Sequence, residues 1–150
     1  LLFINQRAGK EIRPLSLFSG PAAYSASSGT CNVPGIIGLG AAIDYLESKG
    51  VDHIERHGMK LRQRLFHGLK ELPKARVVSP AAGSLASPMI SFTLNSKEPY
   101  PVAQILKEKR NIVVKVASSP GFHGFRISPH LYNDEEDVDL LVDALKEILG

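Results

Sequence analysis

Two long stretches with apolar residues spaced alternately three and four apart constrain the fold more than any other feature of this sequence. The first begins at Val33 and stops at Gly50. The second starts at Asp52, where Glu55 three residues later forms a capping-box pattern, and stops before Pro73. We therefore predict two consecutive amphipathic helices. Their inward-facing positions are Ile36, Leu39, Ile43 and Leu46 in the first and Ile54, Leu61, Leu65, Leu69 and Leu72 in the second.

Short apolar or β-branched runs bounded by Gly, Ser and Pro follow, and such runs are typical of short strands. The predicted strands are residues 76–79, 88–94, 112–117 and 125–128, with a helix at 101–109 between the second and third. Asn133 with Glu136 three residues later starts a final helix, which ends at Gly150. The inward positions of this helix are Val138, Leu141, Leu145 and Ile148. This order predicts an α+β fold with helices packed on one face of a small, mostly antiparallel sheet.

The first 28 residues differ from the rest. Residues 1–5 form an apolar run that is typical of a strand, and residues 7–28 are a polar connector rich in Gly, Pro and Ser. Because the chain begins without Met, directly in an apolar run, we expect it to be a fragment of a longer protein.

Composition and charge argue against several functions. The 18 Lys and Arg residues and the 15 Asp and Glu residues are interspersed and leave a net charge of +3, which gives no support for nucleic-acid binding. No apolar run approaches the roughly 20 residues of a membrane span. No set of Cys and His residues has metal-ligand spacing. We therefore expect neither a metal site nor a membrane partner. The single cysteine, Cys31, has no intramolecular partner for a disulfide, so we expect a cytoplasmic protein.

The Gly29-Thr30 pair directly before the first helix is a candidate anion site. Backbone amides and a hydroxyl at a helix N-terminus favour a ligand such as phosphate. Plain capping is the alternative that these residues alone favour, because Ser and Thr at such places usually satisfy free amides. The adjacent Cys31 is either a nucleophile whose pKa the helix lowers or a small buried apolar residue.

Arg126 is a candidate carboxylate ligand in the last predicted strand. Its neighbours in Gly-Phe-Arg-Ile-Ser are apolar, and an unpaired guanidinium would be costly to bury there. Its planar fork suits bidentate capture of a substrate carboxylate, and a structural salt bridge is an equal alternative. His123, in the loop before it, either contacts a ligand or is solvated. His53 and His57 lack a third metal ligand, so we interpret them as part of a solvated helix face.

Two segments, one toward each end of the chain, stand in the same order as in a known family. One runs from Ser28 through Gly-Thr-Cys-Asn-Val-Pro-Gly-Ile-Ile-Gly-Leu-Gly to Leu46, and the other from Phe125 through Arg-Ile-Ser-Pro-His-Leu-Tyr-Asn-Asp to Leu145. They resemble the opening of the C-terminal region and the Arg-x-Ser, Tyr-Asn pattern of class V aminotransferases, the cysteine desulfurase-like branch of the fold-type I pyridoxal-phosphate enzymes. The opening Leu-Phe-Ile-Asn resembles the last strand of that family's large domain.

This resemblance implies a domain division and a cofactor. Residues 1–28 would be the end of the large cofactor domain and a connector, and residues 29–150 the C-terminal small domain. The family is homodimeric and uses pyridoxal 5'-phosphate, whose phosphate contacts a Gly-Thr pair of the neighbouring subunit. That pair corresponds to Gly29 and Thr30.

The resemblance also implies a substrate site. The family's C-terminal Arg, which binds the α-carboxylate of an amino-acid substrate, corresponds to Arg126. We expect the loop at residues 118–124, with Phe122 and His123, to help select that substrate.

Two departures from the family narrow the expected activity. No Lys follows a His as the cofactor-binding lysine does, so that lysine is expected upstream of Leu1 and the chain alone should be inactive. Desulfurases of the family carry a persulfide-forming Cys between the last two strands, and residues 118–124 hold none. A transaminase, epimerase or C–S lyase type is therefore implied. The alternatives are a cysteine desulfurase, with Cys31 as a relocated thiol, and a stand-alone, non-catalytic interaction domain.

Overall fold

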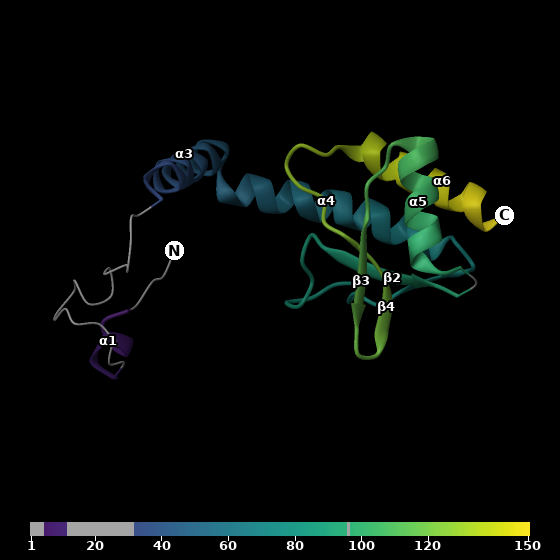
Figure 1. Ribbon diagram of the computed structural model, residues 1–150, viewed down its shortest axis with the longest axis horizontal. Coiled ribbons are helices and arrows are strands. Elements are labelled where there is room, and N and C mark those ends of the chain that lie inside the picture. The colour runs from purple at the N-terminus through teal and green to yellow at the C-terminus, as the bar shows by residue number, and fades with distance from the viewer. Residues whose placement is uncertain (1–4, 12–31, 96) are drawn as a thin grey trace. The chain divides into compact units, whose positions relative to one another are not determined.

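The computed structural model describes residues 5–11, 32–95 and 97–150 (Figure 1). The chain divides into two compact units, residues 1–44 and 45–150. The predicted strand at residues 1–5 lies outside the described residues except for Asn5, which is not in a strand. The predicted connector contains a four-residue helix, α1 (Ala8–Glu11), whose first amide donates to Asn5 Oδ1 at 2.8 Å.

The two predicted long helices are α3 (Val33–Lys49) and α4 (Val51–Lys70). Gly50 separates them with a φ of 82°, a left-handed conformation that glycine adopts without a steric penalty. The predicted capping box of Asp52 and Glu55 is wrong, because the N-cap of α4 is Gly50, two residues before Asp52, and it has no side-chain cap hydrogen bond. Asp52 therefore already lies in the first turn, where its carboxylate faces the positive end of the helix dipole.

Residues 45–150 form the predicted α+β fold (Figure 1). The four-stranded antiparallel sheet has the order β1-β2-β4-β3. Its strands are β1 (Ala75–Val77), β2 (Ile90–Leu94), β3 (Lys115–Ser119) and β4 (Phe122–Ile127). Helices α4, α5 (Pro99–Arg110) and α6 (Glu135–Leu149) pack on one face of this sheet and leave the other uncovered.

The hairpin of β3 and β4 corrects the predicted loop at residues 118–124. Only Pro120 and Gly121 form the turn, and Gly121 has a φ of 80°. Pro followed by a residue with positive φ is the pattern of a type II turn. Ser119 and Phe122 pair directly at its edge. Phe122 and His123 are consequently the first residues of β4 rather than loop residues.

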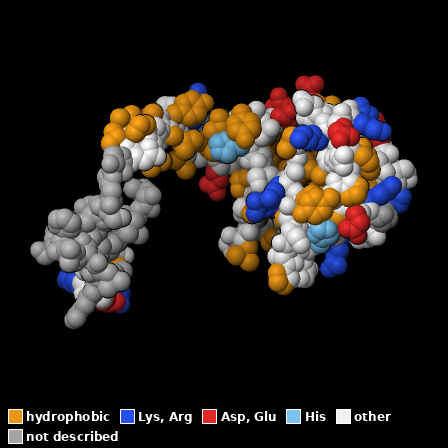
Figure 2. Space-filling model, viewed as in Figure 1, with side chains coloured by type: hydrophobic (Ala, Val, Ile, Leu, Met, Phe, Trp, Pro, Cys, Tyr) orange, Lys and Arg blue, Asp and Glu red, His pale blue; other side chains and the backbone are white. Residues whose placement is uncertain are grey.

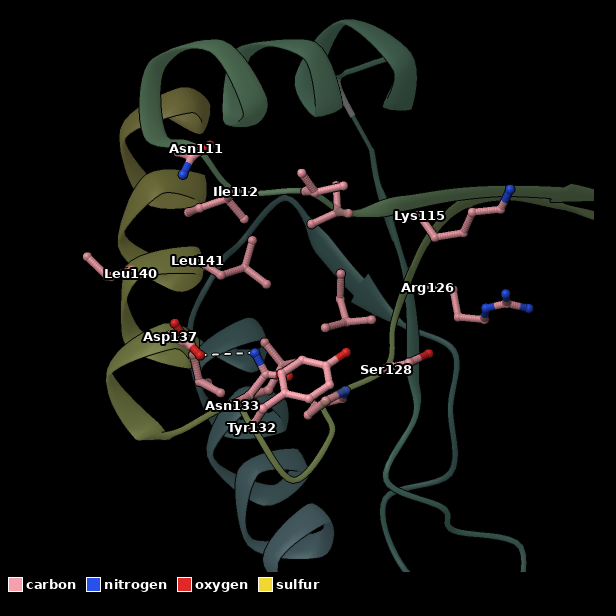
Figure 3. A pocket seen from close by; sticks show the side chains of 16 residues that line it. Asn111, Ile112, Lys115, Arg126, Ser128, Tyr132, Asn133, Asp137, Leu140 and Leu141 are labelled. Atoms are coloured by element: carbon pink, nitrogen blue, oxygen red, sulfur yellow. Dashed lines mark hydrogen bonds between the residues drawn. The ribbon is translucent and has the colours of Figure 1, made fainter. Parts of the chain in front are cut away.

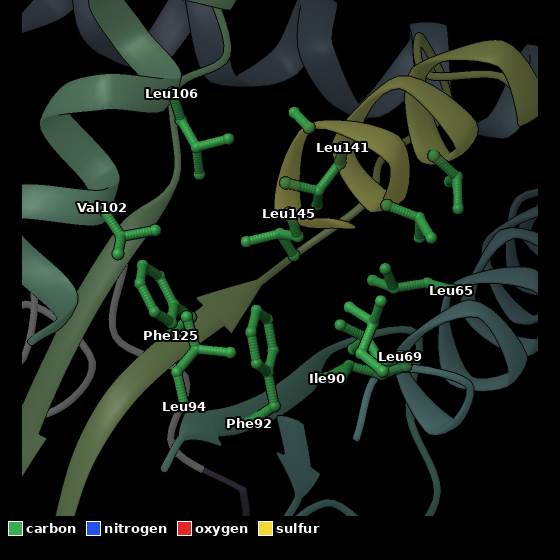
Figure 4. Packing of buried hydrophobic residues seen from close by; sticks show 14 of the residues in the cluster. Leu65, Leu69, Ile90, Phe92, Leu94, Val102, Leu106, Phe125, Leu141 and Leu145 are labelled. Carbon is green, nitrogen blue, oxygen red and sulfur yellow. The ribbon is translucent and has the colours of Figure 1, made fainter. Parts of the chain in front are cut away.

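The core lies between the three helices and the covered sheet face (Figure 4). Leu61, Leu65 and Leu69 of α4 are completely buried against it. Phe92 stacks on Phe125 of the neighbouring strand, with ring centroids 5.1 Å apart. Each such side chain stabilises the fold by roughly 1.5–3 kcal/mol through burial alone.

The final helix begins one residue later than predicted. Asp134 Oδ1 accepts from the Asp137 amide at 3.0 Å, and the Asp137 carboxylate accepts from the Asp134 amide at 3.3 Å. This reciprocal pair is a capping box built on Asp134 instead of Asn133. Asn133 is used differently, since its carbonyl accepts a 2.8 Å hydrogen bond from His57 Nε2 of α4.

Candidate functional site

Strand alternation places Arg126 on the uncovered face of the sheet. Successive side chains of a strand point to opposite faces, so the burial of Phe125 in the core sends Arg126 outward. The guanidinium is exposed. The free-energy cost of burying an unpaired guanidinium therefore does not arise, because α4, α5 and α6 cover only the other face of the sheet.

Lys115 lies beside Arg126 on the same face. The register pairs Arg126 with Lys115 of β3 on one side and with Ser91 of β2 on the other. Residues paired in this way have Cβ atoms about 4.5–5.5 Å apart. Figure 3 shows both cationic side chains pointing the same way, away from Leu141 and Asp137. Sequence reasoning missed Lys115, because the alternation along its strand and the partner strand at residues 125–128 were both predicted, but the register that pairs Lys115 with Arg126 was not.

No acid neutralises this cation pair within the described part of the chain. The four described strands contain neither Asp nor Glu. The ion pairs found among the described residues involve other groups. Asp137, an acid near the same site, is held by the Asp134 amide and by the Asn133 side chain at 3.0 Å. The structural salt bridge considered for Arg126 thus lacks a described acidic partner.

An open pocket of about 540 Å³ adjoins the cation pair (Figure 3). It is bounded by the segment before β3, the segment after β4 and the first turns of α6, and Lys115 and Arg126 contribute to its lining. Tyr132 and Val113 on its walls are each 79% exposed. A volume of this size is typical of sites for small molecules.

Phe122 shares the face of Arg126, with Gly124 between them. A Cβ atom on Gly124 would lie 3.1 Å from Phe122 Cζ and only 2.3 Å from the Phe92 carbonyl oxygen. The Phe122 ring therefore lies beside Gly124, where no larger side chain fits without a shift of the backbone. The structure brings these two predicted site residues, Phe122 and Arg126, onto one surface.

His123 is separated from that surface by the alternation of β4. It pairs with Ser118 across the hairpin and faces α5, where its Nε2 lies 3.5 Å from Glu98 Oε2. The Tyr100 ring is also close, with the ring centroids 6.0 Å apart. Its position favours a contact between the hairpin and the start of α5 over a contact with a ligand bound at Arg126.

Two ion pairs join α4 to α6, away from the open face. Arg64 binds Asp139 through two hydrogen bonds of 2.5 and 2.6 Å, which hold the pKa of the Asp139 carboxyl below its usual range. The side-chain hydrogen bond from Lys60 likewise lowers the pKa of Glu135. These pairs hold the two helices together and stand apart from the candidate site.

Neither a metal site nor a membrane-spanning helix is found among the described residues. His53 and His57 stack with ring centroids 6.4 Å apart, and the described residues contain no group of three or more His, Cys, Asp and Glu that could hold a metal ion. Among the described helices, none has the length and apolar character to cross a membrane.

The predicted phosphate contacts Gly29 and Thr30 lie outside the described residues, as does Cys31. The described residue that follows them, Asn32, caps α3: its Oδ1 accepts from the Gly35 amide and its carbonyl from the Ile36 amide, both at 3.0 Å. The choice between phosphate binding and capping at Thr30 stays a prediction, because Thr30 lies outside the described residues.

Comparisons with known proteins agree with the fold. The sequence profile of the family "Aminotransferase class-V" matches residues 12–141. The chain is 32% identical to a probable cysteine desulfurase of Methanothermobacter thermautotrophicus over 87% of its own length and 34% of the relative's. It is 34% identical to a probable cysteine desulfurase of Streptomyces coelicolor, covering 93% of the chain and 36% of the relative. The chain thus spans about a third of the length of the curated relatives it matches.

Solved structures are likewise similar to this chain over about a third of their own length or slightly more. The apo structure of a cysteine desulfurase from Thermococcus onnurineus has a TM-score of 0.78 at 31% identity, covering 89% of this chain and 35% of that one. A cystine C–S lyase, C-DES, shares the fold with a TM-score of 0.78 at 23% identity, covering 95% of this chain and 40% of that one. A mutant of C-DES carries glycine covalently linked to its pyridoxal-phosphate cofactor.

Proposed function

Because the chain belongs to the aminotransferase class-V family of pyridoxal-phosphate-dependent, fold-type I enzymes, we propose that it is the C-terminal portion of such an enzyme acting on an amino acid. In this proposal residues 1–28 end the large domain and residues 29–150 form the small domain. The observation that carries the proposal is Arg126, an exposed guanidinium on the uncovered sheet face with no acidic partner among the described residues.

Arg126 binds the α-carboxylate of the substrate. A planar guanidinium matches a carboxylate with two parallel hydrogen bonds, which set orientation as well as affinity. Arg126 lies on β4, which is held in place by pairing with β2 on one side and β3 on the other. The substrate is thereby held in a defined direction on this face of the sheet.

Gly29 and Thr30 contact the cofactor phosphate of the neighbouring subunit in a homodimer. The position of this pair just before α3 supports the assignment, because the N-terminus of a helix favours an anionic ligand. When bound, pyridoxal phosphate supplies an electron sink for charge developing at the substrate α-carbon. The lysine that binds the cofactor lies outside these 150 residues.

The hairpin favours a transaminase, epimerase or C–S lyase type of reaction. Its two-residue turn, Pro120-Gly121, holds no cysteine, and neither does any strand residue beside it. The second candidate is a cysteine desulfurase, which the names of the relatives favour. Incubating the complete natural protein with cysteine separates the two: sulfide release that is lost in Cys31→Ser would favour a desulfurase that uses this thiol.

Borohydride reduction of the complete natural protein with pyridoxal phosphate tests the cofactor assignment. We expect one pyridoxyl-lysine, outside these residues, in the peptide mass map. An adduct on Lys10, or no adduct at all, would contradict the proposal.

Arg126→Gln in the same protein tests the substrate assignment, with Arg56→Gln as a control that removes an exposed positive charge from α4. We expect Arg126→Gln to weaken amino-acid binding at least about tenfold, a loss of about 1.4 kcal/mol, with cofactor content unchanged. Equal binding by the two variants would refute the role of Arg126.

A further inference from the structure

Lys115 has no role in the proposed function, although it is the residue directly opposite Arg126. Like charges at paired positions of neighbouring strands destabilise a sheet. No acid in the described strands offsets this pair, and a third exposed cation, Arg76, lies on β1 of the same sheet. An arrangement with this repulsion is most stable with an anionic ligand bound.

We propose that Lys115 and Arg126 together select an amino-acid substrate that carries a second acidic group. Arg126 holds the α-carboxylate and Lys115 holds the side-chain carboxylate. The inference rests on the proposed function, since it assumes that the α-carboxylate lies on Arg126.

Charge and hydrogen-bonding capacity favour two carboxylates over one shared carboxylate. A bidentate pair with Arg126 uses both oxygens of a carboxylate and cancels its charge, which leaves the Lys115 ammonium without a counterion. An ammonium is a compact charge with three donors on a flexible stem, so it can follow a second anion whose position varies with the length of the substrate side chain.

The surface next to the cation pair leaves room for such a substrate. The neighbouring cross-strand pair on this face is Ala117 and Gly124, the two smallest residue types. Gly124 cannot be larger because of the Phe92 carbonyl oxygen, 2.3 Å from where its Cβ would lie. Ser91, on the far side of Arg126, adds a hydroxyl to the same face. The floor therefore carries no large side chain at Ala117 and has both cations at one end. At Gly124 it is bordered by Thr93 Cγ2 and Phe122 Cζ, which lie 3.0 and 3.1 Å from where a Cβ would be.

Binding of alanine, aspartate and glutamate to the complete natural protein loaded with cofactor tests the inference, with dissociation constants taken from spectral titration. Lys115→Gln removes the second cation. Lys109→Gln, on an exposed position of α5, is the control for loss of one lysine, and Lys115→Arg restores the charge. Lys115 is exposed, so its replacement should leave the fold intact, which thermal melting checks.

We expect aspartate or glutamate to bind the parent protein at least about tenfold more tightly than alanine, as one charge-assisted contact allows. Lys115→Gln should remove this preference and leave alanine binding within about twofold, while Lys115→Arg and Lys109→Gln should retain it. Equal affinity of the parent for all three amino acids, or an equal loss for alanine and aspartate in Lys115→Gln, would overturn the inference. Arg126→Gln distinguishes its failure from that of the proposed function, because undiminished alanine binding in this variant would refute the role of Arg126 itself.

Discussion

Helices α3 and α4 were predicted from the same apolar spacing, but the structure gives them opposite surroundings. In α4, Leu61, Leu65 and Leu69 are completely buried against the sheet and α6. In α3 none of the described residues is buried, and Ile36 and Ile37 are 62% and 68% exposed. Figure 2 shows hydrophobic side chains at the surface over α3. The spacing of apolar residues therefore predicts a helix and its apolar face, whereas burial depends on whether a partner surface is present.

Deleting one large apolar side chain from the core and one from α3 should give the largest difference in the free energy of unfolding. Phe125→Ala deletes a completely buried ring stacked on Phe92 and should lower the free energy of unfolding by about 3–5 kcal/mol. Ile37→Ala on α3 should change it by no more than about 0.5 kcal/mol. Urea unfolding of the 150-residue chain followed by circular dichroism measures both, and similar losses would show that α3 is packed in solution.

Replacing one glycine by alanine in each region should change stability in opposite directions. Gly124→Ala forces a Cβ against the Phe92 carbonyl oxygen and should destabilise the chain by roughly 1–3 kcal/mol. Gly38→Ala in α3, where no atom lies within 4 Å of the added Cβ, should stabilise it by about 0.5–1 kcal/mol. Thermal melting of both variants is the measurement. A stabilising Gly124→Ala would mean that β2 and β4 lie farther apart than described.

The starts of α4 and α6 should respond differently to loss of an aspartate. Asp134→Ala removes the capping box of α6 and should cost about 0.5–2 kcal/mol. Asp52→Ala in α4 loses no cap hydrogen bond and should cost less, about 0.5 kcal/mol from the helix dipole. Denaturant midpoints compare the two, and an equal cost would restore the capping role that the sequence predicted for Asp52.

The ion pair of Arg64 and Asp139, between α4 and α6, should have the smallest effect on stability, and this effect should depend on pH. Arg64 lowers the pKa of Asp139 in the folded state below its ordinary value of 3.8, so the stabilising contribution is present above that value. It is lost as the pH falls through the lower folded pKa. The stability difference between the parent and Asp139→Asn should accordingly be constant near neutral pH and disappear in acid. Asp44→Asn on α3, outside the described ion pairs, is the control, and a difference that persists in acid would argue against the pair.

Local patterns predicted the elements of this fold better than their boundaries. Asn133 and Asp134 are both good cap residues, and neither spacing nor propensity chooses between them. The Asn133 carbonyl is engaged by His57, 76 positions away in the sequence, and the capping box forms on Asp134. The hairpin also differs from the prediction because of contacts between strands. Pairing of β3 with β4 up to the Pro-Gly turn makes most of the predicted loop at residues 118–124 part of the strands.

Periodicity and side-chain chemistry were enough to predict the order of helices and strands, the α+β class and Arg126 as a candidate carboxylate ligand. Which side chains share a face depends on how the strands pair in the folded chain. Strand alternation is visible in one segment, but its phase and register depend on contacts between residues far apart in the chain. Those contacts place Lys115 beside Arg126, bring Phe122 onto the same surface and turn His123 toward Glu98.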